Sequence, residues 1–358
     1  MYPTKVKEKL MYWRSKFLIF DTTGLLLFIS LLWVLRSYAP FLDLAQYVPD
    51  DTRPPFYGSG LAIDSHNHIL ILEKEYSRSY IIKFDNKGNM LRRIALEPGS
   101  ANGQFKLVSY TLAVDSQDNI YVSDSGNSRV QKLDADGHFL SSWNIQSYDK
   151  IYPNVIGVAV DNQANVYVID NGSHIQKFDP NGQLLKIWGG LGRDVGRLVH
   201  PYNLAVDKQG SVYVLDNKNI QKFDGEGNFL LRWSSSDPNA ILGSIAIDNQ
   251  NNVYMAQDGR FIVQKFDEVG HLLQSRPSTP GKYPVLSVNI IVDAAGNTYS
   301  TSEQATTIEK YDSSGRMLTS WDYRLPAWFW PFVIINSLLL ALYFIFRLVI
   351  IVRALFRR

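Results

Sequence analysis

The chain has 358 residues, of which 46% are apolar, enough for one large domain or two ordinary ones. It contains no cysteine, which excludes disulfides, thiolate metal sites and cysteine nucleophiles. The net charge is +2, but nine of the 36 basic residues lie before residue 17 or after residue 346. The middle of the chain holds the other 27 basic residues and 32 of the 34 acidic residues, all but Glu8 and Asp21. Its net charge is therefore negative, which argues against a nucleic-acid-binding face.

An apolar segment lies near the N-terminus, at residues 17–35, behind a basic lead at residues 1–16. Nineteen residues that rise about 1.5 Å each reach about 28 Å, close to the thickness of a bilayer's hydrocarbon core. The segment therefore predicts a transmembrane helix, followed by a linker at residues 36–54. A cleaved signal peptide is the alternative, although Pro40 directly follows the weak cleavage site and the charged lead is long.

Six copies of one unit fill residues 55–323. Each copy has four strand-like runs: an apolar run that ends in Asp, an alternating run with Tyr in most copies, a Lys-Phe-Asp run, and a run that ends in Trp in four copies. Ile94 and Arg276 replace this Trp in the other two. The Trp residues and the Lys of each third run are expected to be edge and packing residues. A Gly three residues after the Asp of the third run supplies the positive φ of a tight hairpin: Gly88, Gly137, Gly182, Gly227, Gly270 and Gly315.

The spacing of the copies predicts the fold. No helical periodicity appears within them, and the aspartates that close successive first runs are 41 to 51 residues apart: Asp64, Asp115, Asp161, Asp207, Asp248 and Asp293. A four-stranded unit of about 40–50 residues is typical of a β-propeller, whose sheets bury their faces against their neighbours. The sequence therefore predicts an all-β, six-bladed β-propeller. We expect the ring to close, because an open row would leave two apolar sheet faces in water.

The copies resemble the NHL repeat, most closely at residues 110–137 and 200–227, where they follow the pattern Leu-Ala-Val-Asp, then Tyr-Val, then Gln-Lys-Phe-Asp. The resemblance covers about residues 55–323 and implies an NHL-like six-bladed propeller. The first copy departs from the pattern with ILILEKEYSRSY and the sixth with YSTS, as terminal repeats often do. Similar propellers include binding modules, sensor domains and metal-dependent lyases, so the resemblance does not choose a function.

Carboxylates form the recurrent polar set of the repeats. Nine residues after each Asp of the first run stand Glu73, Asp124, Asp170, Asp216, Gln257 and Ser302. We expect them to ring one rim of the propeller, where a divalent cation such as calcium could bind among their oxygens. The alternative is that each Asp caps the backbone N–H groups of its own loop, a role in which we also expect the aspartates of the first run. The first four are predicted as a binding rim, and the presence of an ion is left open.

Histidines do not repeat at equivalent positions. His66 and His68 lie in the turn after the first run of copy one, and the others are His138, His174, His200 and His271. A metal on the propeller axis would need imidazoles at equivalent positions of several copies, and the equivalents of His200 are Tyr57, Val108, Asn154, Ile241 and Leu286. The histidines are therefore predicted to be surface or turn residues. Nucleophile elbows, metalloprotease motifs and phosphate-binding loops are absent from the sequence.

A second apolar segment lies at residues 328–346 and precedes a basic tail at residues 347–358. Its length predicts a second transmembrane helix, with a buried core helix as the alternative. Both basic clusters lie on the terminal sides of the apolar segments, so the positive-inside rule places both termini in the cytoplasm. The sequence thus predicts a two-pass integral membrane protein that contacts the lipid bilayer through two helices and holds the propeller on the extracytoplasmic side.

Two classes of function remain. In the first, the propeller is a membrane-anchored binding or scaffolding platform that docks another membrane or extracytoplasmic protein, or a glycan, through its variable rim loops. In the second, it is an extracytoplasmic metal-dependent lyase or lactonase with a divalent ion on the axis. The missing histidine set favours the first class, so we expect this chain to bind rather than to catalyse.

Overall fold

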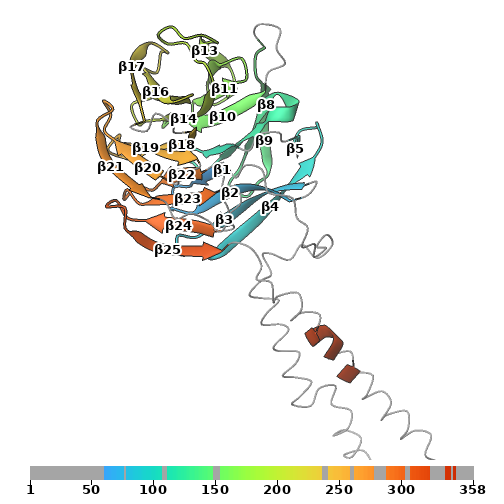
Figure 1. Ribbon diagram of the computed structural model, residues 1–358. Coiled ribbons are helices and arrows are strands. Elements are labelled where there is room, and N and C mark those ends of the chain that lie inside the picture. The colour runs from blue at the N-terminus through green and yellow to red at the C-terminus, as the bar shows by residue number, and fades with distance from the viewer. Residues whose placement is uncertain are drawn as a thin grey trace, which may run out of the picture. The chain divides into compact units, whose positions relative to one another are not determined.

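The computed structural model describes residues 60–75, 78–106, 111–147, 154–235, 241–258, 262–277, 288–302, 307–322, 335–339 and 342–343. The chain divides into two compact units, and the unit Arg53–Tyr323 contains every described strand. Its strands form six sheets, each of four consecutive antiparallel strands, with one extra strand on the first sheet. This arrangement confirms the predicted six-bladed β-propeller (Figure 1).

The blades follow chain order. Blade one holds β1 (Gly60–Ile63), β2 (Ile69–Glu75), β3 (Arg78–Phe84), β4 (Met90–Pro98) and the short parallel β5 (Gln104–Phe105). Blade two holds β6 (Leu112–Val114), β7 (Ile120–Asp124), the 3₁₀ turn η2 (Ser125–Asn127), β8 (Arg129–Leu133) and β9 (Phe139–Asn144). Blade three holds β10 (Val155–Val160), β11 (Val166–Asp170), β12 (His174–Phe178) and β13 (Leu184–Gly189).

The second half of the propeller repeats this order. Blade four holds β14 (Pro201–Val206), β15 (Val212–Asp216), β16 (Asn219–Phe223) and β17 (Phe229–Ser234). Blade five holds β18 (Ile241–Ile247), β19 (Val253–Asp258), β20 (Ile262–Phe266) and β21 (Leu272–Pro277). Blade six holds β22 (Val288–Val292), β23 (Thr298–Ser302), β24 (Thr307–Tyr311) and β25 (Met317–Asp322).

The second strand of a blade is the most deeply buried. Every residue of β7, β11 and β15 is buried, because the blade has a neighbouring sheet on each face. Their runs, Ile-Tyr-Val in β7 and Val-Tyr-Val in β11 and β15, suit this place, since β-branched and aromatic side chains pack well on a pleated surface. The outermost strands alternate instead, as in β17, where one face packs and the other is exposed. The core is therefore a series of apolar layers between blades.

Blade one and blade six are each built from consecutive strands, so neither blade borrows a strand from the other end of the propeller. The ring therefore closes through side-chain packing between the two blades. One apolar cluster joins Ile69, Ile71 and Tyr80 of blade one to Tyr299 and Ile308 of blade six. Figure 1 shows the blue strands of blade one beside the orange and red strands of blade six. Each apolar sheet face at the junction is thus covered, as closure requires.

The predicted Trp and Gly positions meet at the borders between blades. The Trp143 side chain lies on the turn glycine Gly182 of the next blade, and Trp321 of blade six lies on Gly88 of blade one. Ile94 and Arg276 occupy the same place in the two blades that lack this Trp. The packing role predicted for the Trp residues is therefore a contact with the hairpin turn of the following blade, and Ile94 and Arg276 make the same contact.

The substitution Gly182→Ala should destabilise the propeller for two reasons. Gly182 has φ +84°, where a Cβ costs about 1–2 kcal/mol, and that Cβ would lie 2.8 Å from the Trp143 ring. Such overpacking adds about 1–3 kcal/mol. Gly210→Ala is the matched control, because Gly210 has φ +82° and nothing within 4 Å of its Cβ position. Urea unfolding should show the larger loss for Gly182→Ala, and equal losses would contradict the role of the Trp contact.

The predicted location in the membrane is contradicted. Among the described residues no helix is long and apolar enough to cross a bilayer. Of the predicted helix at residues 328–346, the structure describes residues 335–339 and 342–343, which are helical, and the rest of that segment lies outside the described residues. The two-pass integral membrane assignment, its cytoplasmic termini and its lipid contact are accordingly withdrawn.

The other terminal segments of that prediction, residues 1–16, 17–35, 36–54 and 347–358, lie outside the described residues. The exact boundaries predicted for the propeller, residues 55 and 323, stay predictions.

Candidate functional site

The two ends of the propeller carry different connections. In each blade the second strand runs antiparallel to the first, so the start of the first and the end of the second lie at the same end. We call this end the loop rim; its described segments are residues 98–106, 125–128, 145–147, 171–173, 190–200 and 217–218. The other end, which we call the turn rim, carries the tight turns after the first and third strands, such as residues 64–68 and 85–89. The predicted carboxylates belong to the loop rim.

The carboxylates predicted as a binding rim are all buried. Glu73, Asp124, Asp170 and Asp216 are 0–5% exposed, and the side chains of Gln257 and Ser302 lie outside the described part of the structure. Among the described residues the only group of three or more His, Asp or Glu side chains close enough to share an ion lies elsewhere, on the turn rim. The four carboxylates therefore do not converge on a shared calcium ion, and their role in binding stays a prediction.

Asp124 is the centre of a buried polar network. Its Oδ1 accepts the backbone N–H of Lys106 at 2.7 Å, and its Oδ2 accepts from Arg129 Nε at 2.7 Å and from Gln131 Nε2 at 2.9 Å. Asn127 donates to both carboxylate oxygens. Arg129 in turn donates to two backbone carbonyls of the preceding linker. The network thus fastens the linker from blade one onto blade two.

Asp170 and Asp216 fasten loops in the same way without an arginine. Asp170 Oδ1 accepts the N–H groups of Gly172 and His174 at 2.9 Å. Asp216 Oδ1 accepts the N–H groups of Val199 and His200 at 2.9 and 2.8 Å. These contacts are those of the loop-capping alternative, because each carboxylate satisfies backbone donors of its own blade or of the linker that enters it.

Three buried glutamines complete the hydrogen-bond networks around Asp124, Asp170 and Asp216, and the sequence did not lead us to predict them. Gln131, Gln176 and Gln221 each donate to the carboxylate of their own blade and to a carbonyl of the linker that enters it. The available signal was the Gln that precedes Lys-Phe-Asp or Lys-Leu-Asp in four copies. Because that Gln stands on the third strand and its partner on the second, no local spacing rule connects them.

The loop at residues 190–200, between blades three and four, presents the most exposed apolar side chains of the described loop rim. Leu191 is 72% exposed and Val195 is 70% exposed, and Tyr202 nearby on β14 is 46% exposed. The loop is nevertheless held firmly at its base. Backbone bonds join Gly190 to Leu198 and Gly192 to Leu198, the Leu198 side chain is fully buried, and Asp216 holds the last two residues. A fixed loop thus carries an apolar tip into water.

Comparison with known proteins identifies the repeat. The family model of the NHL repeat matches residues 111–133, which run from β6 to β8. The human NHL repeat-containing protein 3 is 24% identical over 190 residues, which cover 46% of this chain and 53% of that protein. This chain contains an NHL repeat. The protein brain tumor of Drosophila melanogaster is 29% identical over 147 residues, 39% of this chain and 14% of that protein. The chain thus spans about half the length of one of these relatives and a small part of the other.

Solved structures show the same fold. A streptogramin B lyase superposes with a TM-score of 0.55 at 12% identity, over 76% of this chain and 85% of that chain. A protein of unknown function from Bacteroides caccae gives a TM-score of 0.52 at 15% identity, over 71% and 93%. At such identities the likeness establishes the β-propeller architecture and nothing about its chemistry.

The axis of the propeller contains a cavity of about 240 Å³. The first strands of all six blades line it with small and aliphatic side chains. Its polar members lie near the loop rim, where each first strand begins: Thr111, Asn203, Ser244 and Asn289. No carboxylate or imidazole occurs among the described residues of the lining. The lining therefore does not fit a divalent ion on the axis, which prefers anionic oxygen or imidazole ligands.

The turn rim carries the aspartates of the first strands, which act as the predicted turn formers. Asp115 Oδ1 accepts the N–H groups of Gln117 and Asn119, and the other five turns repeat this bond pattern. The Tyr121 hydroxyl donates to Asp115 at 2.9 Å. Burial and the neighbouring Asp115 carboxylate raise the pKa of Tyr121, so this phenol stays a neutral donor.

Blade one has the same turn with different side chains. Burial tends to raise the pKa of Asp64, but hydrogen bonds from Lys83 and His68 outweigh it and hold the pKa of Asp64 below its usual value. Asp64 is therefore an ionised acceptor within the turn.

Proposed function

We propose that this NHL propeller is a recognition module that docks a protein partner through its loop rim, with the loop at residues 190–200 as the central contact. One observation carries the proposal: Leu191 and Val195 are about 70% exposed at the tip of a loop whose base is fixed. A pre-ordered apolar tip loses little conformational freedom on binding, and burial of such side chains supplies much of the energy of protein interfaces. The rim carboxylates act in this proposal by holding the loops in place.

The chemistry of the tip favours a protein over a glycan. Leu191 and Val195 offer no hydrogen bonds to sugar hydroxyl groups, whereas they fit an apolar pocket on a protein. Arg193 and Asp194 lie exposed between them and provide one charge of each sign at the edge of the contact. We therefore expect a partner with an apolar pocket bordered by charged groups. The NHL-repeat relatives support a binding role as a class without naming this partner.

The lyase alternative has no supporting observation in this chain. The similarity to streptogramin B lyase extends to the fold alone, and the described lining of the axis offers neither carboxylate nor imidazole. We propose no reaction step.

Site-specific photo-crosslinking in cells that express the chain tests the proposal. A photoreactive phenylalanine analogue is placed at position 191 or 195, and in matched controls at position 230 or 273. The controls replace leucines of the outer strands β17 and β21 that are 48% and 54% exposed. We expect the same discrete protein adduct from positions 191 and 195, and none from the controls. Equal adducts from all four positions, or none from the loop, would overturn the proposal.

A further inference from the structure

The turn between β1 and β2 differs from its five counterparts in its side chains. Two residues after the aspartate, blade one has His66, and the other blades have Gln117, Gln163, Gln209, Gln250 and Ala295. Four residues after it, blade one has His68, and the others have Asn119, Asn165, Ser211, Asn252 and Asn297. Imidazoles thus stand at both positions in this turn and at neither position in the others.

The imidazole of His68 takes over the structural bond of an amide. His68 Nδ1 lies 2.8 Å from Asp64 Oδ2, as Asn119 Nδ2 lies 2.9 Å from Asp115 Oδ2. Asp64 also accepts the backbone N–H groups of His66 and His68 and lies beside Lys83, so it acts as an acceptor throughout this turn. A hydrogen bond from Nδ1 to such an acceptor leaves Nε2 with its lone pair. An amide nitrogen has no such lone pair to offer. The exchange of Asn for His therefore keeps the turn and adds a metal-binding atom.

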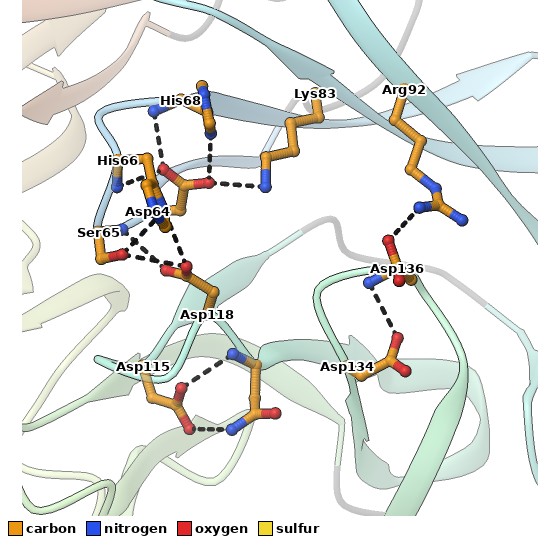
Figure 2. Close-up of polar contacts among 11 residues, drawn as sticks. Asp64, Ser65, His66, His68, Lys83, Arg92, Asp115, Asp118, Asp134 and Asp136 are labelled. Carbon is orange, nitrogen blue, oxygen red and sulfur yellow. Dashed lines mark hydrogen bonds and ion pairs between the residues drawn. The ribbon is translucent and has the colours of Figure 1, made fainter.

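A third departure from the repeat lies beside the first two. Three residues after the aspartate, blade two has Asp118, where the other blades have Asn67, Ala164, Gly210, Asn251 and Gly296. Asp118 Oδ2 lies 3.1 Å from His66 Nδ1, and Asp118 also accepts from the backbone and hydroxyl of Ser65. Figure 2 shows Asp118 reaching across to the blade-one turn that carries both histidines.

The two imidazoles lie close together. Their ring centroids are 5.6 Å apart and the rings are nearly parallel, at 16°. Suitable ligand atoms of Asp64, His66 and His68 all lie within 4.8 Å of one another. Two atoms that bind one zinc ion at about 2.0–2.1 Å lie at most about 4.2 Å apart. The His66 side chain is 68% exposed, so we expect its ring to be able to turn toward that of His68 when both bind one ion.

We propose that His66 and His68 bind a Zn²⁺ ion through their Nε2 atoms, each oriented by a carboxylate on its Nδ1: Asp118 for His66 and Asp64 for His68. Imidazoles suit zinc, and carboxylates that orient ligating histidines are a common feature of zinc sites. Because Asp118 belongs to blade two, the site links the first two blades of the ring.

The local charge is compatible with a bound cation. Lys83 Nζ lies 2.7 Å from Asp64 Oδ2 and balances that carboxylate. Among the described residues Asp118 makes no ion pair with a Lys or Arg, so one negative charge is left to attract the ion. Two imidazole ligands leave the remaining positions of the zinc ion to water.

Zinc titration of the full-length chain, purified without a polyhistidine tag, tests the site. Isothermal titration calorimetry should show one Zn²⁺ bound per chain. The double variant His66→Gln/His68→Asn carries the residues of blades two, three and five, so it should fold normally and bind at least 30-fold more weakly. Asp118→Asn should bind about 10–100-fold more weakly, the usual cost of removing an orienting carboxylate.

His138→Asn and His271→Asn are the matched controls, because each removes a lone histidine that pairs with a turn aspartate at 2.9 Å. Both controls should bind zinc as the unaltered chain does. Thermal unfolding without metal checks that each variant is folded, and added zinc should raise the unfolding temperature of the unaltered chain and not that of the double variant. Zinc binding by the double variant equal to that of the unaltered chain, or no binding by the unaltered chain at millimolar zinc, would overturn the proposal.

Discussion

Deletion of blade six, residues Val288–Asp322, is expected to leave a chain that aggregates or loses its cooperative unfolding transition. The deletion would uncover five buried side chains of blade one: Ile69, Ile71, Tyr80, Ile82 and Phe84. At about 1.5–3 kcal/mol for each buried side chain, the loss is roughly 7–15 kcal/mol, comparable to the stability of a whole domain. Blade five would also lose its neighbour. Analytical ultracentrifugation and thermal unfolding provide the measurement.

A paired substitution tests closure without removing a blade. Trp321 packs on Gly88 across the junction of the last and first blades, as Trp188 packs on Gly227 between two interior blades. If the ring is closed, Trp321→Ala and Trp188→Ala should each cost about 3–5 kcal/mol, the usual loss for a packed Trp. A soluble deletion variant with an unchanged unfolding temperature, together with a negligible effect of Trp321→Ala, would contradict closure and indicate an open array.

The substitution Asp124→Ala is expected to lower the free energy of unfolding by about 3–5 kcal/mol, because it leaves a buried guanidinium without its counter-charge. Arg129 has only 9% of its side chain exposed, and its Nε lies 2.7 Å from Asp124. The linker at Lys106 loses an acceptor at the same time. Denaturant unfolding of the variant measures the loss.

Asp170→Ala is the matched control for the charge effect. Asp170 is similarly buried and, like Asp124, accepts from backbone N–H groups and from one glutamine. Its neighbour in the described contacts is His174, 3.4 Å away, and not an arginine. Its loss should be smaller, about 1–3 kcal/mol for donors left unsatisfied. Equal losses for the two variants would show that the Arg129 pair adds nothing beyond loop capping.

Much of the propeller could be predicted because the same strand and turn patterns recur in all six copies of the repeat. The alternating Ile-Tyr-Val and Val-Tyr-Val runs form β7, β11 and β15, and the aspartates of the first runs form turns, as predicted. Even the atypical run of copy one forms the regular pair β2 and β3, since burial between two sheets, more than a consensus residue, decides strand formation there. The prediction of a membrane helix at residues 328–346 rested only on the length of its apolar run. Among the described residues no helix is long and apolar enough to span a bilayer.

The candidate site was predicted less well, because its contacts join residues from different strands and blades. The rim position of the three aspartates followed from their spacing. Their hydrogen bonds with Gln131, Gln176 and Gln221 did not, because these glutamines stand on the third strand and also contact the entering linker. In the same way, His66 and Asp118 stand in different copies and meet only when blades one and two pack together. A single copy contains no signal for such a contact.

The binding role of the loop at residues 190–200 is tested most directly by the affinity of the partner that the crosslink captures. Calorimetric or surface-plasmon measurements would compare the unaltered chain with Leu191→Asp and with the control Leu230→Asp, whose leucine is 48% exposed on β17. Loss of a central apolar contact costs about 2 kcal/mol or more, so Leu191→Asp should weaken binding about 30-fold or more. Leu230→Asp should leave the dissociation constant unchanged within about twofold. An unchanged affinity for Leu191→Asp, or equal weakening by both substitutions, would contradict recognition through this loop.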